Sequence, residues 1–449
     1  MDIRRTRTNS LSEEILITKS NYKKIINSQT KNFIEKYRDY DVCELALKKN
    51  LRTEIDFSFA INQIAIRQKH SKKFPTLLRD FYFPSTVSVE QSSSEITAKY
   101  KSEIINDFNV SADLTGGLGI DSLYFAKKSA KHIYCEQNTI YCDFFRNNCA
   151  ATNQNNIEFA NQNCEDFIKK CIEQKDFFDV VYIDPSRRDK NNQKKFLLKD
   201  LQPDVFILQK YLPQITKKVI IKFSPMLDIS TVLKDIDSVR EVHIISVENE
   251  CKELLLVLDF AKDISMNAST VIKYFAVNLI HISDYIADSS KKMYDRNLKI
   301  KVEKIELKKN ANEKINFTLP QKYIYEPNSS IMKLGFWEDF CHKYSLNKLH
   351  QNSHLFTSNE LLLDFPGRVF ELIAITKYSS KEANNILQNE RKANITVRNF
   401  PYSVAEIHQK LKLKDGGNYY IFATTIMDNK QTQALRLLIT RKITTCKIT

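Results

Sequence analysis

Glycine is rare in this sequence of 449 residues, which contains only seven glycines, ten prolines and one tryptophan. Long apolar runs are missing too, since none approaches the roughly 18 residues that span a bilayer as a helix. The opening segment MDIRRTRTNS lacks the apolar stretch of a signal peptide. With 42% hydrophobic and 27% charged residues, the composition indicates a soluble globular protein, and we expect a cytoplasmic protein without membrane attachment.

The sequence has no Cys-x-x-Cys pair, and its nine cysteines are an odd number. Five of them fall within or beside predicted core elements: Cys135, Cys142, Cys149, Cys164 and Cys171. This pattern is typical of reduced thiols that pack as small hydrophobic side chains, and it argues against a disulfide framework or a zinc site. His350 and His354 are four residues apart but lack a His-Glu-x-x-His pattern, so we expect no metal.

Acidic residues are outnumbered, which gives a net charge of +14. The excess of Lys and Arg over Asp and Glu is +6 for residues 1–100, −3 for 101–260 and +11 for 261–449. Two basic flanks would attract a polyanion and make its binding depend on salt. A Lys-rich composition with solvated faces explains the same numbers equally well.

The predicted secondary structure changes character twice along the chain. Residues 1–99 are predicted to form a helical N-terminal domain, with a turn-rich connection at 81–95. From 108 to 260, short β-branched runs alternate with predicted helices, which indicates a parallel sheet with helices on both faces. These helices are expected at 120–130, 139–152, 164–173, 203–215 and 228–237.

The last two strands of this region break the alternation. EVHIISVEN and ELLLVLDF are separated only by Glu250–Lys252, too short for a crossover helix, so they are expected to pair antiparallel. Beyond residue 262 the pattern becomes α+β. Residues 298–310 alternate like an exposed strand, and 397–443 predict a strand, a helix and two further strands.

Three of the seven glycines, Gly116, Gly117 and Gly119, lie between the first strand and the next helix. Glycine lets backbone approach a ligand closely, and such a loop offers free N–H groups. A dinucleotide fingerprint would need glycine at position 122, where Ser122 stands, and this counts against NAD. Asp113 precedes the glycines and could accept from the ammonium of a bound amino-acid moiety.

Two further polar positions end the second and third strands. Glu136 can accept from both ribose hydroxyls of a nucleoside, although an exposed acid at a strand end is the alternative. Asn163 and the N–H of Cys164 could bind adenine, but a plain helix N-cap by Asn163 is equally compatible with the sequence.

The fourth strand, FDVVYIDP, ends in Asp184-Pro185-Ser186-Arg187-Arg188. It is apolar, and it delivers Asp184 to the edge of the sheet where α/β proteins bind ligands. The two arginines could pair with phosphate, or be solvated in an ordinary turn. Lys222, near the end of the fifth strand, could face a phosphate or only solvent.

In their order and spacing, Asp113–Gly119, Glu136, Asn163 and Asp184-Pro185 resemble class I S-adenosylmethionine-dependent methyltransferases. Over about residues 55–449 the chain is similar to one bacterial group that carries ferredoxin-like and C-terminal THUMP-like domains. The runs that carry this resemblance are EQSSSEITAKYK (90–101), IDPSRRD (183–189), IKFSPMLDI (221–229), ENECKELL (248–255), YEPNSSIMK (325–333), DFPGRVF (364–370) and VRNFPYSVAEI (397–407).

The resemblance implies a Rossmann-like methyltransferase sheet at 100–262, a ferredoxin-like domain at 263–325, a connection at 326–376 and a THUMP-like domain at 377–449. It implies methyl transfer from S-adenosylmethionine to a tRNA or rRNA base. The implied cofactor residues are Asp113, Thr115, Gly116, Gly117, Gly119, Glu136, Asn163, Cys164 and Asp184. Asp184 and Pro185 would be catalytic, and Arg187, Arg188 and Arg398 would bind RNA.

One departure puts the acceptor in doubt. Enzymes that methylate base amines usually have a second proline and an aromatic residue after Asp-Pro, where this chain has Ser186 and Arg187. If Asp184 holds a base amine, the stacking ring must therefore come from elsewhere. A methyltransferase for proteins or small molecules, or an inactive RNA-binding protein, stays open as an alternative.

Overall fold

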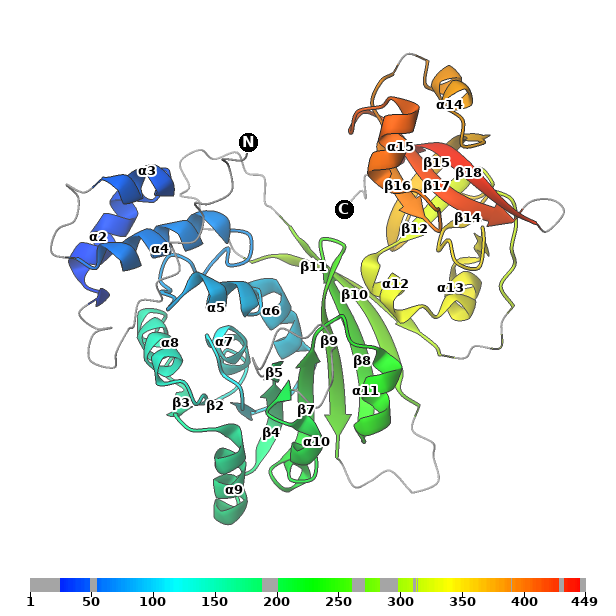
Figure 1. The fold of residues 1–449 in the computed structure, drawn as a ribbon. Helices are drawn as coiled ribbons and strands as arrows, with labels where there is room; N and C mark the ends of the chain where they lie inside the picture. Colours follow the sequence, from blue (N-terminus) through cyan, green and yellow to red (C-terminus); the bar gives the residue numbers. More distant parts are fainter. Residues whose placement is uncertain are drawn as a thin grey trace, which may run out of the picture. The chain divides into compact units, whose positions relative to one another are not determined.

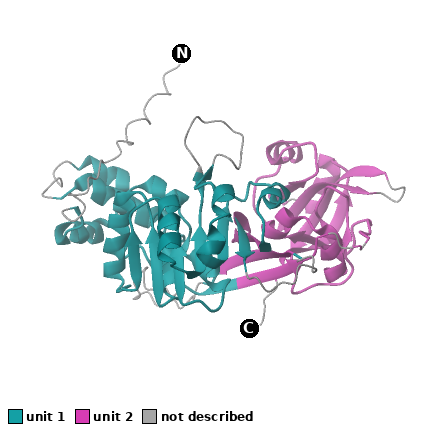
Figure 2. Ribbon diagram, turned by 90° about the horizontal axis from the view of Figure 1, so that it is seen from below, with its two compact units in different colours: residues 1–240, 254–271, 281–301 teal, residues 241–253, 272–280, 302–449 magenta. Residues whose placement is uncertain are grey.

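The computed structural model describes residues 25–48, 55–187, 201–260, 271–282, 298–309, 312, 314–388, 390–427 and 432–444, without the side chain of Arg187. The chain divides into two compact units (Figure 2). Unit 1 contains residues 1–240, 254–271 and 281–301, and unit 2 contains residues 241–253, 272–280 and 302–449. The candidate cofactor residues all lie in unit 1.

Short helices make up the N-terminal part of unit 1, and each begins at a polar cap. The side chains of Asn27, Asp56 and Ser94 accept from backbone N–H groups in the first turns of their helices, as N-caps do. The helices are α2 (Ser28–Tyr37), α3 (Val42–Leu47), α4 (Phe57–Lys69), α5 (Thr86–Gln91) and α6 (Glu95–Glu103). Helix α5 lies inside the segment 81–95, where the sequence predicted only turns.

These helices share a hydrophobic core with the sheet region. Phe83, Val89 and Ala98 from the N-terminal part pack in one cluster with Leu123 and Phe145. A second cluster, which includes Ile34, Leu45 and Phe59, comes almost entirely from the N-terminal part, with Phe144 as its one buried member from the sheet region.

A nine-stranded sheet positions the site, in the order β11-β10-β8-β9-β7-β4-β1-β2-β3 (Figure 1). Its strands are β1 (Val110–Asp113), β2 (Lys131–Cys135), β3 (Ile157–Ala160), β4 (Phe178–Ile183), β7 (Thr216–Phe223), β8 (Val239–Val247), β9 (Glu250–Asp259), β10 (Lys273–His281) and β11 (Ile300–Leu307). The first five of these pair in parallel. Val180, Val181 and Ile183 of β4 are fully buried, as the apolar sequence of this strand predicted.

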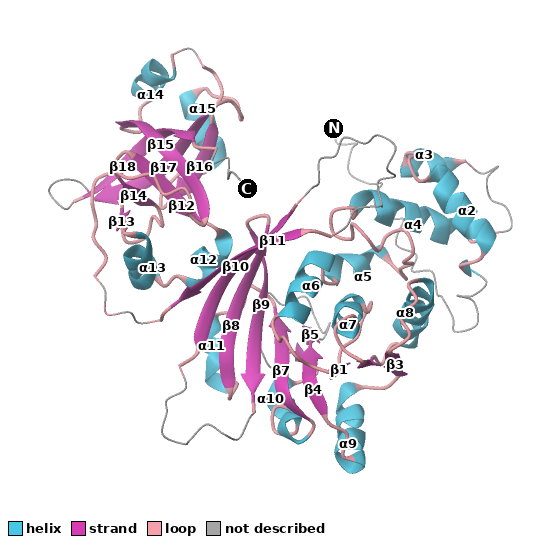
Figure 3. Cartoon of the chain, turned by 180° about the vertical axis from the view of Figure 1, so that it is seen from behind, coloured by secondary structure: helices cyan, strands magenta, loops and turns pink. Residues whose placement is uncertain are grey.

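The predicted crossover helices are present in the described chain (Figure 3). They are α7 (Ile120–Ala126), α8 (Thr139–Ala151), α9 (Cys164–Gln174), α10 (Val205–Leu208) with a 3₁₀ turn at Leu212–Gln214, and α11 (Ile229–Asp235). Strand β9 runs antiparallel to β7, and only two residues separate β8 from β9. The predicted α/β sheet with an antiparallel hairpin is therefore confirmed.

The region after the hairpin differs from the expected domain order. Strands β10 and β11 come from residues 263–325, where a ferredoxin-like domain was expected, yet they belong to the nine-stranded sheet. Strand β10 pairs with β8 in parallel. The alternation of exposed and half-buried residues in β11 fits an edge strand with one solvated face.

Unit 2 contains a seven-stranded sheet in the order β13-β14-β12-β15-β18-β17-β16. Its strands are β12 (Tyr323–Pro327), β13 (Asn347–Lys348), β14 (Phe356–Ser358), β15 (Gly367–Thr376), β16 (Asn394–Arg398), β17 (Tyr419–Met427) and β18 (Gln433–Lys442), with helices α12 (Ser329–Leu334), α13 (Trp337–Tyr344), α14 (Ser380–Leu387) and α15 (Val404–Leu411). The strand, helix and two strands predicted for 397–443 are all present. Within the described ranges, every helix falls short of the length and apolarity needed to cross a membrane.

Candidate active site

The candidate residues gather where the parallel strands end. Asp113, the last residue of β1, is in register with Tyr182 on β4 and with Tyr134 on β2. Asp184 and Glu136 each lie two residues beyond those partners, so they reach the same carboxyl edge as the glycine loop. α/β proteins bind ligands at this edge of the sheet.

The glycine loop is packed tightly on one side. A Cβ added to Gly116 would lie 2.2 Å from the Tyr134 ring, and one added to Gly119 would lie 2.2 Å from the Phe145 ring. Gly119 also has φ +78°, in the left-handed region that favours glycine. Glycine is needed here for the path of the backbone as well as for any ligand.

We expect Gly119→Ala to lower the free energy of unfolding by about 2–4 kcal/mol, because it combines left-handed strain with overpacking. Gly416 is a matched control: its φ is +102° and nothing lies within 4 Å of an added Cβ. Gly416→Ala should cost only about 1 kcal/mol. Urea unfolding followed by circular dichroism measures both, and equal losses would show that the contact with Phe145 is unimportant.

Asp113 is buried, and its carboxylate accepts hydrogen bonds from the residues on either side of the glycines. Its Oδ1 accepts from the Thr115 N–H at 3.0 Å, and its Oδ2 accepts from the Ser122 hydroxyl at 2.6 Å. Burial raises the pKa of Asp113 to about 7, although both hydrogen bonds oppose the shift. Ser122, singled out in the sequence only as a missing glycine, is thus the partner of the strand-end acid.

Glu136 faces the glycine loop. Its Oε2 accepts from the Gly117 N–H at 2.8 Å, and its Oε1 accepts from the Asn138 N–H at 2.7 Å. The Tyr134 hydroxyl donates to the Gly117 carbonyl at 2.5 Å and fixes the loop from the same strand. The carboxylate is therefore held beside the loop, and is not a loose acid at a strand end.

Asn163 caps helix α9. Its Oδ1 accepts from the Asp166 N–H at 2.8 Å, and its amide nitrogen donates to Asp166 Oδ2 at 2.7 Å. The N-cap alternative left open by the sequence is realised. Cys164 follows and is buried, and this burial raises the pKa of its thiol. A contact of either residue with adenine stays a prediction.

Asp184 is tied to the glycine loop through Thr115. The Asp184 N–H donates to Thr115 Oγ1 at 2.7 Å, while the backbone of Thr115 donates to Asp113. One threonine thus links the two strand-end acids. Pro185 is buried next to Asp184, and the chain then enters the short antiparallel pair β5 (Ser186–Arg187) and β6 (Leu201–Gln202).

Lys222 lies at the candidate site and contacts one of its acidic residues. Its ammonium forms an ion pair with Asp184, with side-chain exposures of 13% for Lys222 and 31% for Asp184. Desolvation raises the pKa of Asp184, and Lys222 is the largest opposing influence. The sequence left the role of Lys222 open because the pairing depends on the register of two strands.

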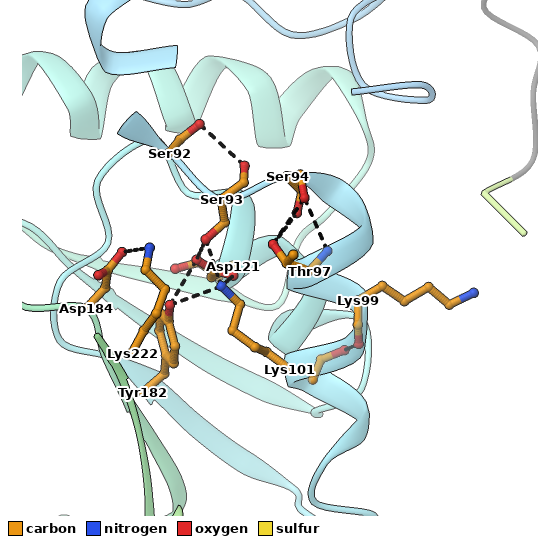
Figure 4. Close-up of polar contacts among 12 residues, drawn as sticks. Ser92, Ser93, Ser94, Thr97, Lys99, Lys101, Asp121, Tyr182, Asp184 and Lys222 are labelled. Atoms are coloured by element: carbon orange, nitrogen blue, oxygen red, sulfur yellow. Dashed lines mark hydrogen bonds and ion pairs between the residues drawn. The ribbon is translucent and has the colours of Figure 1, made fainter. Parts of the chain in front are cut away.

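A buried polar cluster lies beside this pair and was not found from the sequence (Figure 4). Lys101 Nζ lies 2.8 Å from Asp121 Oδ1 and donates to Ser93 Oγ at 2.7 Å. The Tyr182 hydroxyl donates to Asp121 Oδ2 at 3.2 Å, and Ser93 donates to the same oxygen at 2.7 Å. Ser93 and Lys101 fall in the run EQSSSEITAKYK, which was the only sequence signal for them.

Of the three predicted RNA-binding arginines, the structure describes the side chain of Arg398 alone. Arg188 and the side chain of Arg187 lie outside the described part of the chain. Arg398 donates to Oε1 of the buried Glu326 at 2.8 Å, and Arg368 Nε donates to Oε2 of the same carboxylate at 2.6 Å. With 39% and 34% of their side chains exposed, the two guanidinium groups also reach solvent. The pair of arginines exceeds the charge of its one carboxylate.

His350 and His354 do not share a helix face, because they flank a turn at residues 351–353. His350 Nδ1 accepts from the Asn352 N–H at 3.1 Å. Over the described residues, no group of three or more His, Cys, Asp or Glu side chains is placed to hold a metal ion.

Two family models match the C-terminal part of the chain. A ferredoxin-like domain matches residues 323–366, and a THUMP-like domain matches residues 367–442. Both matches differ from the expected boundaries, since 263–325 was expected for the first and 377–449 for the second. No curated protein matches the chain in sequence.

Among solved structures, the chain is similar to a candidate methyltransferase from Porphyromonas gingivalis W83, with 27% identity and a TM-score of 0.77. That match covers 94% of this chain and 99% of the other. An S-adenosylmethionine-dependent methyltransferase from Agrobacterium tumefaciens matches with 12% identity and a TM-score of 0.28, over 39% of this chain and 62% of the other. An rRNA methylase from Streptococcus thermophilus matches with 13% identity and a TM-score of 0.27, over 36% and 93%. The last two scores are too low to support an argument.

The sheet and the similarity to the P. gingivalis protein together define a Rossmann-like methyltransferase fold of class I. The chain combines this fold with N-terminal helices, a ferredoxin-like domain and a THUMP-like domain.

Proposed function

We propose that this protein transfers a methyl group from S-adenosylmethionine to RNA, a tRNA or an rRNA. The observation that carries the proposal is the gathering of the glycine loop, Glu136 and Asp184 at the carboxyl ends of β1, β2 and β4. Direct hydrogen bonds link the loop to both acids. Strand-end positions of this kind form the ligand sites of open α/β sheets.

The loop fits a nucleoside ligand at Gly117. A Cβ added there would have only the Thr115 carbonyl within 4 Å, at 3.7 Å, whereas the other two loop glycines face packed aromatic rings. One side of the loop therefore packs on protein, and the Gly117 side leaves space for a ligand to approach the backbone. The carboxylate of Glu136 stands beside this open position.

Within the proposal, Glu136 accepts from the ribose hydroxyls, and Asp184 with Pro185 orients the acceptor. The remaining cofactor residues are Asp113, Thr115, Gly116, Gly117, Gly119, Asn163 and Cys164. S-adenosylmethionine supplies an already activated methyl group. The main task of the protein is therefore alignment of the acceptor, for which a fixed strand edge is suited.

Three observations support RNA as the partner. The THUMP-like match covers residues 367–442, and residues 261–449 carry an excess charge of +11. In this part of the chain, Arg368 and Arg398 both pair with the carboxylate of Glu326 and are partly exposed to solvent. Guanidinium groups bind phosphate in bidentate geometry, and phosphate contacts dominate affinity for nucleic acids.

Three measurements test the proposal. Calorimetry should show binding of S-adenosylmethionine, and nucleoside mass spectrometry should find one methylated nucleoside missing from the RNA of cells without this gene. RNA retention on a filter should fall as salt rises. Cofactor binding with unchanged RNA would favour a protein or small-molecule substrate, and RNA binding without cofactor binding would indicate an inactive RNA-binding protein.

A further inference from the structure

Strand register places Asp184 and Lys222 side by side. Strands β4 and β7 run parallel with Ile183 opposite Ile221, so the next residues of the two strands are Asp184 and Lys222. The lysine donates to Asp184 Oδ2. Because Asp184 is the more exposed partner, a substrate at the sheet edge would meet its carboxylate directly.

The buried cluster occupies the other side of the pair (Figure 4). Lys101 is fully buried and forms an ion pair with Asp121, so this lysine cannot reach a substrate. The charge of Lys222 also acts on Asp121. Two lysines and two aspartates thus form a charge-balanced group, in which only the Asp184–Lys222 pair is accessible from the edge of the sheet.

A base amine and a ribose hydroxyl differ in what they can do beside such a pair. An amine nitrogen has one lone pair, so it cannot accept a hydrogen bond from the Lys222 ammonium and attack the methyl group at the same time. A hydroxyl oxygen has two lone pairs, so one can accept from a donor while the other attacks. Either acceptor must lose a proton on methylation, and a carboxylate at the site can take it.

The residues after Asp184 agree with an oxygen acceptor. Ser186 and Arg187 occupy the positions where base-amine enzymes usually have a second proline and a stacking aromatic residue. Both residues are held in the antiparallel pair β5–β6, with Ser186 opposite Gln202. These two positions therefore offer no aromatic ring to stack on a base next to Asp184.

We infer that the acceptor atom is a ribose hydroxyl oxygen of RNA. Asp184 is the proton acceptor, and Lys222 is the residue that positions the Asp184 carboxylate. The inference rests on the proposed function and replaces the base expected from the sequence. The hydroxyl oxygen attacks the methyl carbon, and a C–O bond forms as the C–S bond breaks. The hydroxyl proton passes to Asp184, and S-adenosylhomocysteine leaves with the electron pair of the broken bond.

Alkaline hydrolysis distinguishes the two acceptors. RNA from cells without this gene is incubated with the full-length protein and S-adenosylmethionine labelled in its methyl group. A methylated ribose hydroxyl blocks cleavage of the adjacent phosphodiester, so we expect the label in alkali-resistant dinucleotides. Label in mononucleotides would overturn the ribose assignment and leave the proposed function intact, whereas the absence of label from RNA would contradict the proposed function itself.

The role of Lys222 is tested by Lys222→Met, with Lys218→Met as control. Lys218 lies on the same strand four residues earlier, and therefore on the same face but away from the carboxyl edge. We expect Lys222→Met to slow methyl transfer about 100-fold, within the range for losing an oriented proton acceptor. The control should keep its rate, and affinity for S-adenosylmethionine should stay within about threefold of the wild type in both variants.

The pH profile separates positioning from a merely structural role. Lys222 and Lys101 lower the pKa of Asp184, while desolvation and Asp121 raise it. Loss of Lys222 should therefore move the acidic limb of kcat, measured at saturating S-adenosylmethionine, to higher pH, and Lys222→Arg should restore it in part. An unshifted acidic limb in Lys222→Met would overturn the positioning role.

Discussion

Asp113→Ala is expected to weaken binding of S-adenosylmethionine by at least about 100-fold. The change removes the carboxylate that would face the ammonium of the cofactor, and an ionic hydrogen bond of this kind contributes about 1.5–3 kcal/mol. It also removes the acceptor for the Thr115 N–H and the Ser122 hydroxyl, so the loop loses its support. Calorimetry measures the affinity, and exposed Asp107→Ala is the control. Intact affinity in Asp113→Ala would refute the cofactor assignment.

The same residue gives the binding a pH dependence. The pKa of Asp113 is raised to about 7 by burial and, to a smaller extent, by Asp121 and Asp184, against the hydrogen bonds from Ser122 and Thr115. An ammonium ligand favours the ionised carboxylate, so affinity should fall by up to about tenfold per unit as pH drops from 7 to 5. Asp113→Asn should bind weakly and show no such dependence, and a parallel decline in this variant would assign the effect to another group.

Stability of the free protein should respond in the opposite sense. The folded pKa of Asp113 lies above its unfolded value, so between roughly pH 4 and 7 the folded state holds a proton that the unfolded state has released. The protonated carboxyl of Asp113 therefore contributes up to about 4 kcal/mol to the free energy of unfolding at low pH. This contribution is lost as the pH rises through 7. Asp113→Asn should therefore unfold at a higher temperature than the wild type at pH 8, even though it binds the cofactor poorly.

Asp184→Asn is expected to reduce the rate of methyl transfer by about 100- to 1,000-fold, because the amide cannot take the proton that the acceptor releases. Affinity for S-adenosylmethionine should change less than about threefold, since the Asp184 contact with Thr115 is made by the backbone N–H and survives the substitution. Single-turnover transfer of labelled methyl groups to RNA from cells without the gene measures the rate.

Asp176→Asn is the matched control for that substitution. Asp176 is exposed just before β4, at the opposite end of the strand from the site. Its replacement should leave both rate and affinity unchanged. A normal rate in Asp184→Asn would remove Asp184 from the chemistry, and a parallel loss of cofactor affinity would reassign it to binding alone.

Features set by neighbouring residues were predicted correctly, whereas features set by distant residues were not. The helices at 120–126, 139–151 and 164–174 begin at the predicted residues, because glycine loops and Asn caps are encoded within a few positions. The short helix at 86–91 was missed because the serine and proline residues around it also suit turns. The strands at 273–281 and 300–307 lie in the nine-stranded sheet, although residues 263–325 were expected to form a ferredoxin-like domain, because a strand pattern does not identify its pairing partner.

The order of the strand ends, and the chemistry that each carries, could be predicted from the sequence: Asp113 with its glycines, Glu136, and Asp184. These features are local, because each motif lies within a few residues of the end of its own strand. The pairing of Lys222 with Asp184 and the burial of Lys101 against Asp121 arise only in the folded chain. Those contacts span 38 residues in one case and depend on helix packing in the other, so strand register and burial, rather than any local pattern, create them.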